Sequence, residues 1–287
     1  MSHAEVARVP PPVLPGGYPI TGGYTVIEHL SRGSALDVYE VFSAERMCGC
    51  VAKVVRPDRL GVTRVADRLL SEGRILAALA HPNLVRVLDV RTDPQPVVVL
   101  QRLPGLRLDR LIHQRERPPS ALDIAHFGAH LSSALFYLHG KGFLHLDVRP
   151  RNVIVECGIA VLAGLSLGRA PGLAPRGLGT REYLAPEQAT GAPLTAASDV
   201  WGLGATLYEL AAGTPPFAAL DDEDQRLWDA GEYLQLHRPA RPLGHYRRLP
   251  DALAGITENC LRADPAARPS IVEVSAVLTA LTSTPEV

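Results

Sequence analysis

The sequence predicts an α+β fold in which strands come first and helices follow. Three short runs of strand-forming residues, separated by turn-rich breaks, cover residues 24–27, 38–42 and 51–55. Farther along the chain, apolar residues recur at helical spacing from Ile124 to Leu138 and predict a buried helix. A chain of 287 residues is long enough for one large domain or for two lobes that share a cleft.

The composition narrows the class of protein. Hydrophobic residues make up 46% of the chain and charged residues 21%, which favours a well-packed core over disorder. The formal net charge is −1, so the charge balance gives no reason to expect binding to nucleic acid or to an anionic membrane. The sequence shows no signal peptide and no apolar run long enough to span a membrane. We therefore expect a cytoplasmic protein.

The first 22 residues differ in composition from the rest. They include Pro10–Pro12, Pro15 and the pair Gly16-Gly17. This composition favours a flexible or polyproline-like leader over residues 1–22. The alternative is a docking segment for a domain of the SH3 type, which binds proline-rich peptides.

The four cysteines do not predict a metal site. Cys48 and Cys50 form a single C-x-C pair, whereas a structural zinc site needs four ligands and usually two such pairs. Reduced thiols in a cytosolic protein are the simpler interpretation.

A polar stretch near the middle of the chain, His145–Asn152, carries the strongest functional signal. It resembles the catalytic loop of protein kinases, H-R-D-x-x-x-x-N. In that family the aspartate accepts the proton of the substrate hydroxyl and the asparagine holds a magnesium ion, and these roles fall on Asp147 and Asn152. The sequence departs from the pattern at Leu146, where the family usually has arginine.

The resemblance extends to the glycine-rich loop that covers the phosphates of ATP, G-x-G-x-x-G-x-V, which corresponds to residues 31–38. The family uses glycines there because a side chain blocks the close approach of the backbone to the phosphates. Gly33 and Val38 match the pattern, whereas Ser31 and Leu36 replace the first and third glycines. We expect a turn, but not a tight phosphate cradle.

Lys53 falls at the family's strand lysine, which contacts the α- and β-phosphates. Its expected partner is Glu72, which lies in a segment with helical apolar spacing. The alternative is an ordinary surface ion pair. However, Lys53 interrupts an apolar strand, and it is one of only two lysines among 29 Lys and Arg residues. The context favours the functional interpretation.

The next segments resemble the end of the small lobe. Residues 80–87 are similar to the loop and strand that follow the helix of the paired glutamate, and Val97–Gly105 is similar to the last strand and the hinge. The resemblance implies that backbone groups of Gln101 and Leu103 read the adenine ring, with Leu100 behind them. The alternative is an ordinary exit from a strand into a loop.

A predicted hairpin over residues 153–162 leads to the segment that aligns with the family's D-F-G, whose aspartate binds magnesium. Gly164 stands at the position of that aspartate, and no Asp or Glu occurs from residue 163 to residue 181. Asn152 is then the remaining metal ligand. We expect magnesium binding to be weak or absent.

Residues 168–179 correspond to the activation segment of the family. This segment is rich in Gly, Pro and Ala and contains no Ser, Thr or Tyr. A regulated kinase needs a phosphate acceptor here and an arginine before the catalytic aspartate to bind the phosphate. The chain lacks both, because Leu146 stands at the position of that arginine.

Three motifs of the large lobe follow in order: A-P-E at residues 185–187, the start of the central helix at residues 198–204, and D-P-x-x-R-P at residues 264–269. The resemblance implies that Asp199 holds the backbone of the catalytic loop. It also implies a buried ion pair between Glu187 and Arg268.

Together the matches span roughly residues 24–283 and imply a two-lobed protein-kinase fold. The small lobe is an antiparallel β lobe with one main helix, and the large lobe is mostly helical. We place the kinase-like domain at residues 23–283, with the small lobe at 23–103, the large lobe at 104–283 and a tail at 284–287. The resemblance is closest to bacterial serine/threonine kinases of the receptor-kinase type, without their membrane helix.

These features predict a pseudokinase, meaning a kinase-fold module that acts as a regulatory or protein-binding partner. Its binding of ATP would be weak or independent of magnesium. The alternative is an active but unconventional ATP-dependent Ser/Thr protein kinase with a protein substrate, in which Asp37 or Glu156 supplies the missing carboxylate. A small-molecule kinase of the aminoglycoside type shares H-x-D-x-x-x-x-N, but the motifs at residues 185–187 and 198–201 disfavour it.

Overall fold

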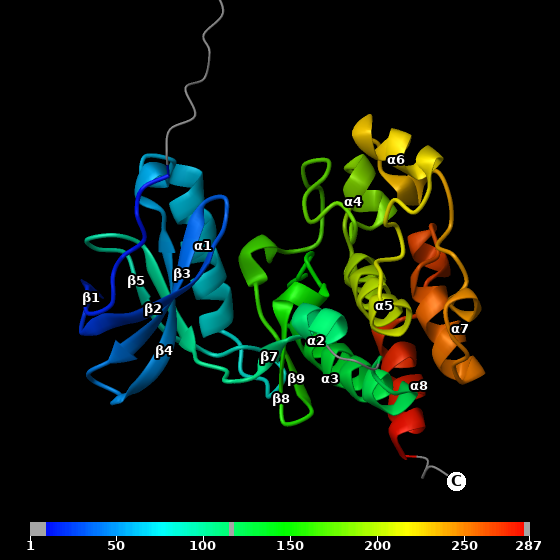
Figure 1. Ribbon diagram of the computed structural model, residues 1–287, viewed down its shortest axis with the longest axis horizontal. Coiled ribbons are helices and arrows are strands. Elements are labelled where there is room, and N and C mark those ends of the chain that lie inside the picture. The colour runs from blue at the N-terminus through cyan, green and yellow to red at the C-terminus, as the bar shows by residue number, and fades with distance from the viewer. Residues whose placement is uncertain (1–9, 115–117, 284–287) are drawn as a thin grey trace, which may run out of the picture. The chain divides into compact units, whose positions relative to one another are not determined.

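The computed structural model describes residues 10–114 and 118–283, so residues 1–9 of the predicted leader and the predicted tail lie outside the described residues. The chain divides into two compact units (Figure 1). The first comprises the chain up to Ala78 together with Arg86–Arg102, and the second comprises Leu79–Val85 together with the chain from Leu103 onward. Strands dominate the first unit and helices the second, which confirms the predicted fold class.

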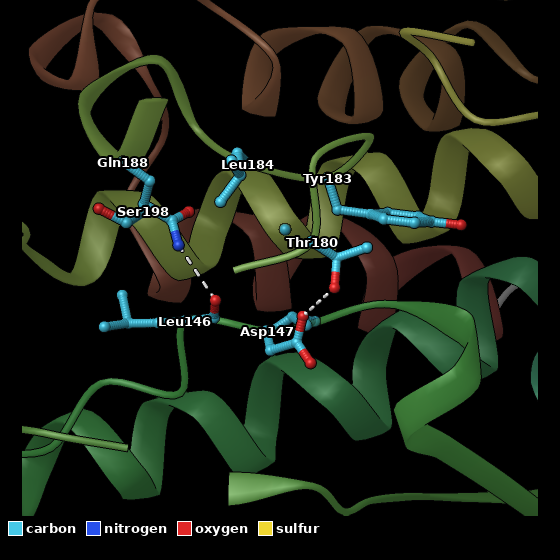
Figure 2. Close-up of a pocket in the computed structure, with 9 residues that line it drawn as sticks. Leu146, Asp147, Thr180, Tyr183, Leu184, Gln188 and Ser198 are labelled. Carbon is cyan, nitrogen blue, oxygen red and sulfur yellow. Dashed lines mark hydrogen bonds between the residues drawn. The ribbon is translucent and has the colours of Figure 1, made fainter. Parts of the chain in front are cut away.

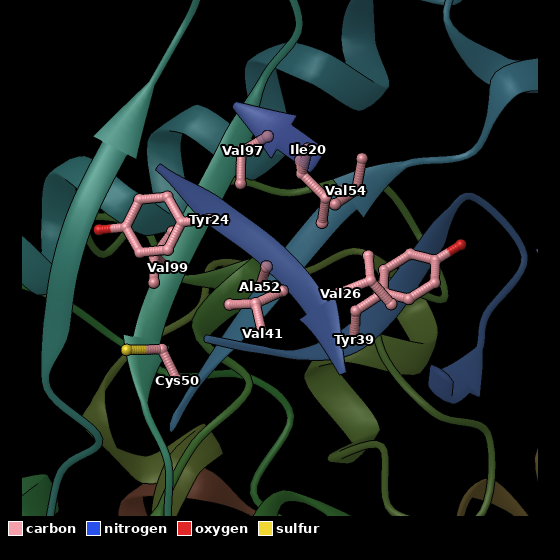
Figure 3. Packing of buried hydrophobic residues seen from close by; sticks show 10 residues of the cluster. All are labelled: Ile20, Tyr24, Val26, Tyr39, Val41, Cys50, Ala52, Val54, Val97 and Val99. Atoms are coloured by element: carbon pink, nitrogen blue, oxygen red, sulfur yellow. The ribbon is translucent and has the colours of Figure 1, made fainter. Parts of the chain in front are cut away.

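A six-stranded antiparallel sheet forms most of the first unit, with the strand order β1-β2-β3-β4-β6-β5. Alternate residues along these strands share one face, because the side-chain period of a strand is two. On that face they form a buried apolar cluster (Figure 3). The strands are β1 (Pro19–Thr21), β2 (Tyr24–Arg32), β3 (Leu36–Ser43), β4 (Cys48–Val55), β5 (Val87–Arg91) and β6 (Val97–Gln101).

Part of the predicted leader is built into this unit. Strand β1 pairs with β2, and Ile20 is buried in the apolar cluster. Leu14 packs against the same cluster, and its backbone N–H donates to the Tyr39 hydroxyl at 3.1 Å. The prediction of a flexible leader is therefore corrected for these residues, because Leu14 and Ile20 bury apolar surface in spite of their Pro- and Gly-rich surroundings.

The four cysteines are free thiols. Cys50 is buried in the apolar cluster, and burial raises its pKa to about 11. A thiol must lose its proton to bind a metal, so this environment disfavours a metal-binding role for Cys50.

Helix α1 (Thr63–Ala77) packs against β5 and β6. Its apolar face buries Leu69 and Leu76. Gly73 permits the close approach, since a Cβ atom at this position would lie 2.8 Å from a methyl group of Val90 and 2.9 Å from one of Val98. This packing fixes the side of the helix that carries Glu72.

The second unit contains a small antiparallel sheet with the order β7-β8-β9 and the remaining α-helices of the described residues. The strands are β7 (Leu106–Arg107), β8 (Val153–Glu156) and β9 (Ile159–Leu162). The helices are α2 (Leu108–Gln114), α3 (Ala121–Gly140), α4 (Pro186–Thr190), α5 (Ala196–Ala212), α6 (Asp222–Asp229), α7 (Asp251–Cys260) and α8 (Ile271–Ser283). Single 3₁₀ turns lie at Pro57–Arg59 in the first unit and, in the second, at Pro150–Asn152, Leu165–Leu167, Leu234–Leu236, Leu243–His245 and Pro265–Ala267.

Helices α3 and α5 form the centre of the second unit. Helix α3 begins with a capping box between Ser120 and Asp123, and its predicted apolar stripe is buried from Ile124 to Leu138. Every residue of α5 from Ser198 to Ala211 is buried. Among the described residues, no helix combines the length and the apolar character that crossing a bilayer requires.

Candidate functional site

Lys53 on β4 and Glu72 on α1 form the predicted ion pair within the first unit. Lys53 Nζ lies 2.6 Å from Glu72 Oε1. The Glu72 side chain is 0% exposed and that of Lys53 is 15% exposed, so this is not a surface pair. The second oxygen, Glu72 Oε2, is buried and has no hydrogen-bond partner within the described part of the chain.

The turn between β2 and β3, which contains Gly33, is closed by hydrogen bonds. The Gly33 N–H donates to the Leu36 carbonyl at 2.8 Å. The Arg56 guanidinium donates to the Gly33 carbonyl at 2.9 Å, and the Arg56 backbone N–H donates to the Ala35 carbonyl at 3.0 Å. The predicted turn is therefore present, but it is tied to the end of the neighbouring strand. Its Gly33 N–H is already engaged by the protein.

The base of the same turn is held by a buried carboxylate. Asp37 is 1% exposed, and its two oxygens accept hydrogen bonds from Arg32 at 2.7 and 2.9 Å. His29 lies 3.3 Å from one of these oxygens, and Arg32 also donates to the Pro11 carbonyl at 2.7 Å. Burial by itself would raise the pKa of Asp37, but the hydrogen bonds from Arg32 and His29 lower it overall. The suggestion that Asp37 is a spare metal ligand is therefore wrong.

The other residues predicted to contact the nucleotide lie in β3, at the end of β6 and just after β6. Val38 is in β3, directly opposite Lys53 in β4. Gln101 ends β6, and its N–H donates to the Arg86 carbonyl at 2.9 Å. Leu103 is the first residue of the second unit after β6. The backbone N–H of Gln101, one of the two predicted hinge residues, is therefore already paired with Arg86.

In the second unit, Asp199 at the start of α5 holds the backbone of the catalytic loop as predicted. Its oxygens accept hydrogen bonds from the N–H groups of His145 at 2.8 Å and Leu146 at 2.7 Å, and from His139 Nε2 at 2.8 Å. Burial by itself would raise the pKa of Asp199, but the hydrogen bond from His139 and the nearby His145 lower it overall. Leu146 adopts a positive φ of 63°, which these bonds support.

Three donors converge on the carboxylate of Asp147, the predicted catalytic base. Thr180 Oγ1 donates to Oδ1 at 2.8 Å (Figure 2). Asn152 Nδ2 donates to Oδ2 at 2.7 Å and to the Asp147 carbonyl at 2.8 Å, and Arg149 Nε donates to Oδ2 at 3.2 Å. The structure thus brings Asp147 and Asn152 together. Thr180 and Arg149 were not predicted as partners of Asp147, although Thr180 is the first hydroxyl residue after the activation segment.

The residues around Gly164 do not fit a magnesium ion. Gly164 has a φ of +79°, and a Cβ atom there would lie 2.7 Å from both Cγ and Oδ1 of Asn152. The Asn152 amide therefore occupies the space beside the glycine, and its Nδ2 is committed to Asp147. One neutral amide oxygen is a poor ligand set for a hard cation that prefers carboxylates.

Comparisons with known proteins give the family. The model of the protein kinase domain matches residues 24–277. The chain is 32% identical over 281 residues to the serine/threonine-protein kinase PkaA of Streptomyces coelicolor, covering 88% of this chain and 48% of that protein. It is 32% identical over 257 residues to the DNA damage-responsive serine/threonine-protein kinase RqkA of Deinococcus radiodurans, covering 85% and 37%.

A third relative is the serine/threonine-protein kinase PknB of Mycolicibacterium smegmatis, which is 32% identical over 210 residues, covering 68% of this chain and 33% of that protein. The chain spans about half or less of the length of these curated relatives. All three relatives are named as serine/threonine-protein kinases, which agrees with the two-lobed fold and with the kinase motifs around Asp147, Asp199 and Glu187. The chain therefore belongs to the protein kinase family and, within it, to the bacterial serine/threonine kinases.

Proposed function

We propose that this chain is a pseudokinase: a kinase-fold module that binds other proteins as a regulatory partner and binds ATP weakly and almost independently of magnesium. Membership of the family implies ATP as the nucleotide, generally used with magnesium. The observation that carries the proposal is Gly164, which stands where the family has its metal-binding aspartate. Without that carboxylate, phosphoryl transfer loses a principal source of transition-state stabilisation.

The packing around Gly164 supports this interpretation beyond the sequence change itself. The Asn152 amide fills the space that a larger residue at position 164 would need. Restoring a carboxylate would therefore require Asn152 to move away from Asp147, and its two hydrogen bonds to that residue oppose the movement. The site is packed around the glycine.

The turn at Gly33 provides a second, independent argument. In this family the backbone of the glycine-rich loop approaches the phosphates closely. Here the Gly33 N–H is paired with Leu36, and Arg56 holds the carbonyls of Gly33 and Ala35. Freeing the Gly33 N–H to donate to a phosphate costs the hydrogen bond that it already makes, and the bonds from Arg56 oppose any movement of the turn. This cost supports weak binding.

A second candidate function, an active but unconventional Ser/Thr protein kinase, is favoured by two observations. The ion pair between Lys53 and Glu72 is formed, and Thr180, Asn152 and Arg149 orient the Asp147 carboxylate. These are the groups that would contact phosphate and position a substrate hydroxyl. In this reading a carboxylate other than Asp37 must supply the metal site, and Glu156 is the remaining suggestion.

The nucleotide prediction separates the two candidates. For the parent protein, adding magnesium should change the apparent ATP affinity by less than about tenfold, or ~1.4 kcal/mol. The Lys53→Ala variant should abolish ATP binding, because Lys53 is the predicted phosphate contact. Isothermal titration with and without magnesium measures both effects. Lys141→Ala is the matched control, since it removes the other lysine of the chain at an exposed position.

Tight ATP binding that requires magnesium, together with transfer of radiolabelled phosphate to a protein, would replace the pseudokinase proposal with the second candidate. ATP binding that survives Lys53→Ala would show instead that the nucleotide contact has been misplaced. In the titration, the first result appears as ATP binding that requires magnesium, and the second as ATP binding that persists in the Lys53→Ala variant.

Phosphorylation of the purified protein gives a further prediction. The activation segment has no hydroxyl group, so no phosphate is expected within residues 168–179. We also expect Thr180 to remain unmodified, because its hydroxyl is hydrogen-bonded to Asp147 and Leu146 replaces the arginine that would bind a phosphate. Intact-mass and peptide mass spectrometry test both statements. Stoichiometric phosphothreonine at position 180 would count against the pseudokinase proposal.

A further inference from the structure

The activation segment lies against an apolar cluster rather than a charged site. Leu144, Leu146 and Leu194 form the buried centre of this cluster, and Ala174 and Leu178 of the activation segment pack against it. We call these five residues the Leu146 cluster. Leu146 is 3% exposed, so the side chain at the position of the family's phosphate-binding arginine is committed to packing. Burial of this apolar surface attracts the segment whether or not a phosphate is present.

Backbone hydrogen bonds attach the same segment at three points. Leu144 and Arg169 exchange two bonds, of 2.7 and 3.2 Å, and Gly172 and Leu194 exchange two, of 3.0 and 2.8 Å. The Gly177 N–H donates to the Gln188 carbonyl at 2.8 Å. The amides of Arg169, Gly172 and Gly177 are therefore paired, although none of them lies in a helix or a named strand.

Gln188 adds a side-chain connection between the activation segment and the catalytic loop. Its Nε2 donates to the carbonyls of Leu146 at 3.0 Å and Leu178 at 2.9 Å, and its Oε1 accepts from the Ala185 N–H at 3.0 Å. Figure 2 shows the bond to Leu146 beside the one from Thr180 to Asp147. Gln188 is 3% exposed, so both of its amide protons are used inside the protein.

We propose that the activation segment is held permanently in one conformation by the Leu146 cluster and Gln188, without phosphorylation. In a phosphate-regulated kinase, an arginine at position 146 would leave a buried charge unpaired until a phosphate arrived. Leucine at this position has no such requirement. The segment is then a constant surface of the protein, whether or not a nucleotide is bound.

Amide hydrogen exchange tests this lock on the parent protein without nucleotide. We expect Arg169, Gly172 and Gly177 to exchange at least tenfold more slowly than unprotected amides, and we expect phosphatase treatment to leave the rates unchanged. Leu178→Ala should accelerate exchange within residues 168–179 by about tenfold or more, because it removes packing from the Leu146 cluster. Exchange in α3 and α5 reports whether the rest of the unit remains folded.

Leu173→Ala is the matched control, because Leu173 lies in the same segment but is 73% exposed. It should leave the exchange rates unchanged. Should Leu178→Ala unfold the whole unit, Leu178→Val removes less packing, and we expect it to produce a smaller acceleration confined to the segment. Unprotected amides in the parent, or equal effects of the Leu178 and Leu173 variants, would overturn the proposal. Neither outcome depends on ATP binding, so the pseudokinase proposal is tested separately.

Discussion

Replacing Arg268 by alanine should lower the free energy of unfolding by about 3–5 kcal/mol, because it leaves the buried Glu187 carboxylate without its cationic partner and with a hydrogen bond from Ser198 Oγ at 2.8 Å. The two side chains form a forked pair, with Arg268 Nη1 and Nη2 at 2.7 and 2.8 Å from the two oxygens of Glu187. The Arg268 side chain is 0% exposed and that of Glu187 is 5% exposed. Solvent therefore does little to compensate for the lost partner.

The remaining donors of Arg268 make the loss larger than that of a single ion pair. They reach the carbonyls of Arg262, Ala197 and Ala263 at 2.8, 2.8 and 3.1 Å. The guanidinium also lies over the Trp201 ring, 4.9 Å from its centre. All five N–H groups of the guanidinium are thus paired within one unit, and the substitution releases every one of these contacts.

Thermal unfolding measures the effect. At this chain length, about 1 kcal/mol corresponds to a shift of roughly 2–4 °C in Tm, so a drop of the order of 6–20 °C or insoluble protein is expected. Arg262→Ala is the control, since Arg262 is exposed and its carbonyl, which accepts from Arg268, is retained. A variant at position 268 as stable as the parent would mean that this pair does not hold the second unit together.

Glu209 should make the stability of the protein fall as the pH rises from about 4.5 to about 7. Burial raises the pKa of this α5 carboxyl to about 7, and the nearby Glu182 and Asp109 act in the same direction. The Tyr183 hydroxyl, which donates to Glu209 at 2.6 Å, and the charge of Arg149 oppose the rise but do not cancel it. His113 lies 3.6 Å from the other oxygen.

The sign follows from proton binding. Between the ordinary glutamate pKa and about 7, the folded state holds a proton that the unfolded state has released. The contribution of Glu209 is therefore fully present below pH 4.5 and is lost as the pH approaches 7. The total change is about 3 kcal/mol, at 1.36 kcal/mol for each pKa unit.

Glu209→Gln should remove this dependence, because the amide stays neutral and can still accept a hydrogen bond from Tyr183. Denaturant unfolding at several pH values should show the variant gaining on the parent by about 3 kcal/mol between pH 4.5 and 7. Above that range the difference should remain constant. Glu223→Gln, the same change at an exposed position on α6, should follow the parent at every pH. Parallel curves for the parent and Glu209→Gln would contradict the raised pKa.

The short polar motifs of the sequence determined the fold and the frame of the candidate site. Asp147 and Asn152 could be placed in one loop in advance because their five-residue spacing matches the catalytic-loop motif, whereas the 2.7 Å hydrogen bond between them is a finding of the structure. Asp199 and the pair of Glu187 and Arg268 were also predicted. Each of these residues lies in a motif of the kinase family, and the resemblance to that family implied its partner, so no knowledge of the path of the chain between motifs was needed.

Only the tertiary structure decided what replaces the missing parts of the kinase pattern. The sequence shows that Leu146 and Gly164 depart from the family, but it does not show that Leu146 packs against Leu178 or that the Asn152 amide fills the space beside Gly164. It suggested Asp37 as a spare carboxylate, which in the fold is neutralised by Arg32. An apolar contact or a hydrogen bond between distant residues depends on where the backbone brings them together, and residue type and spacing carry no record of that distance.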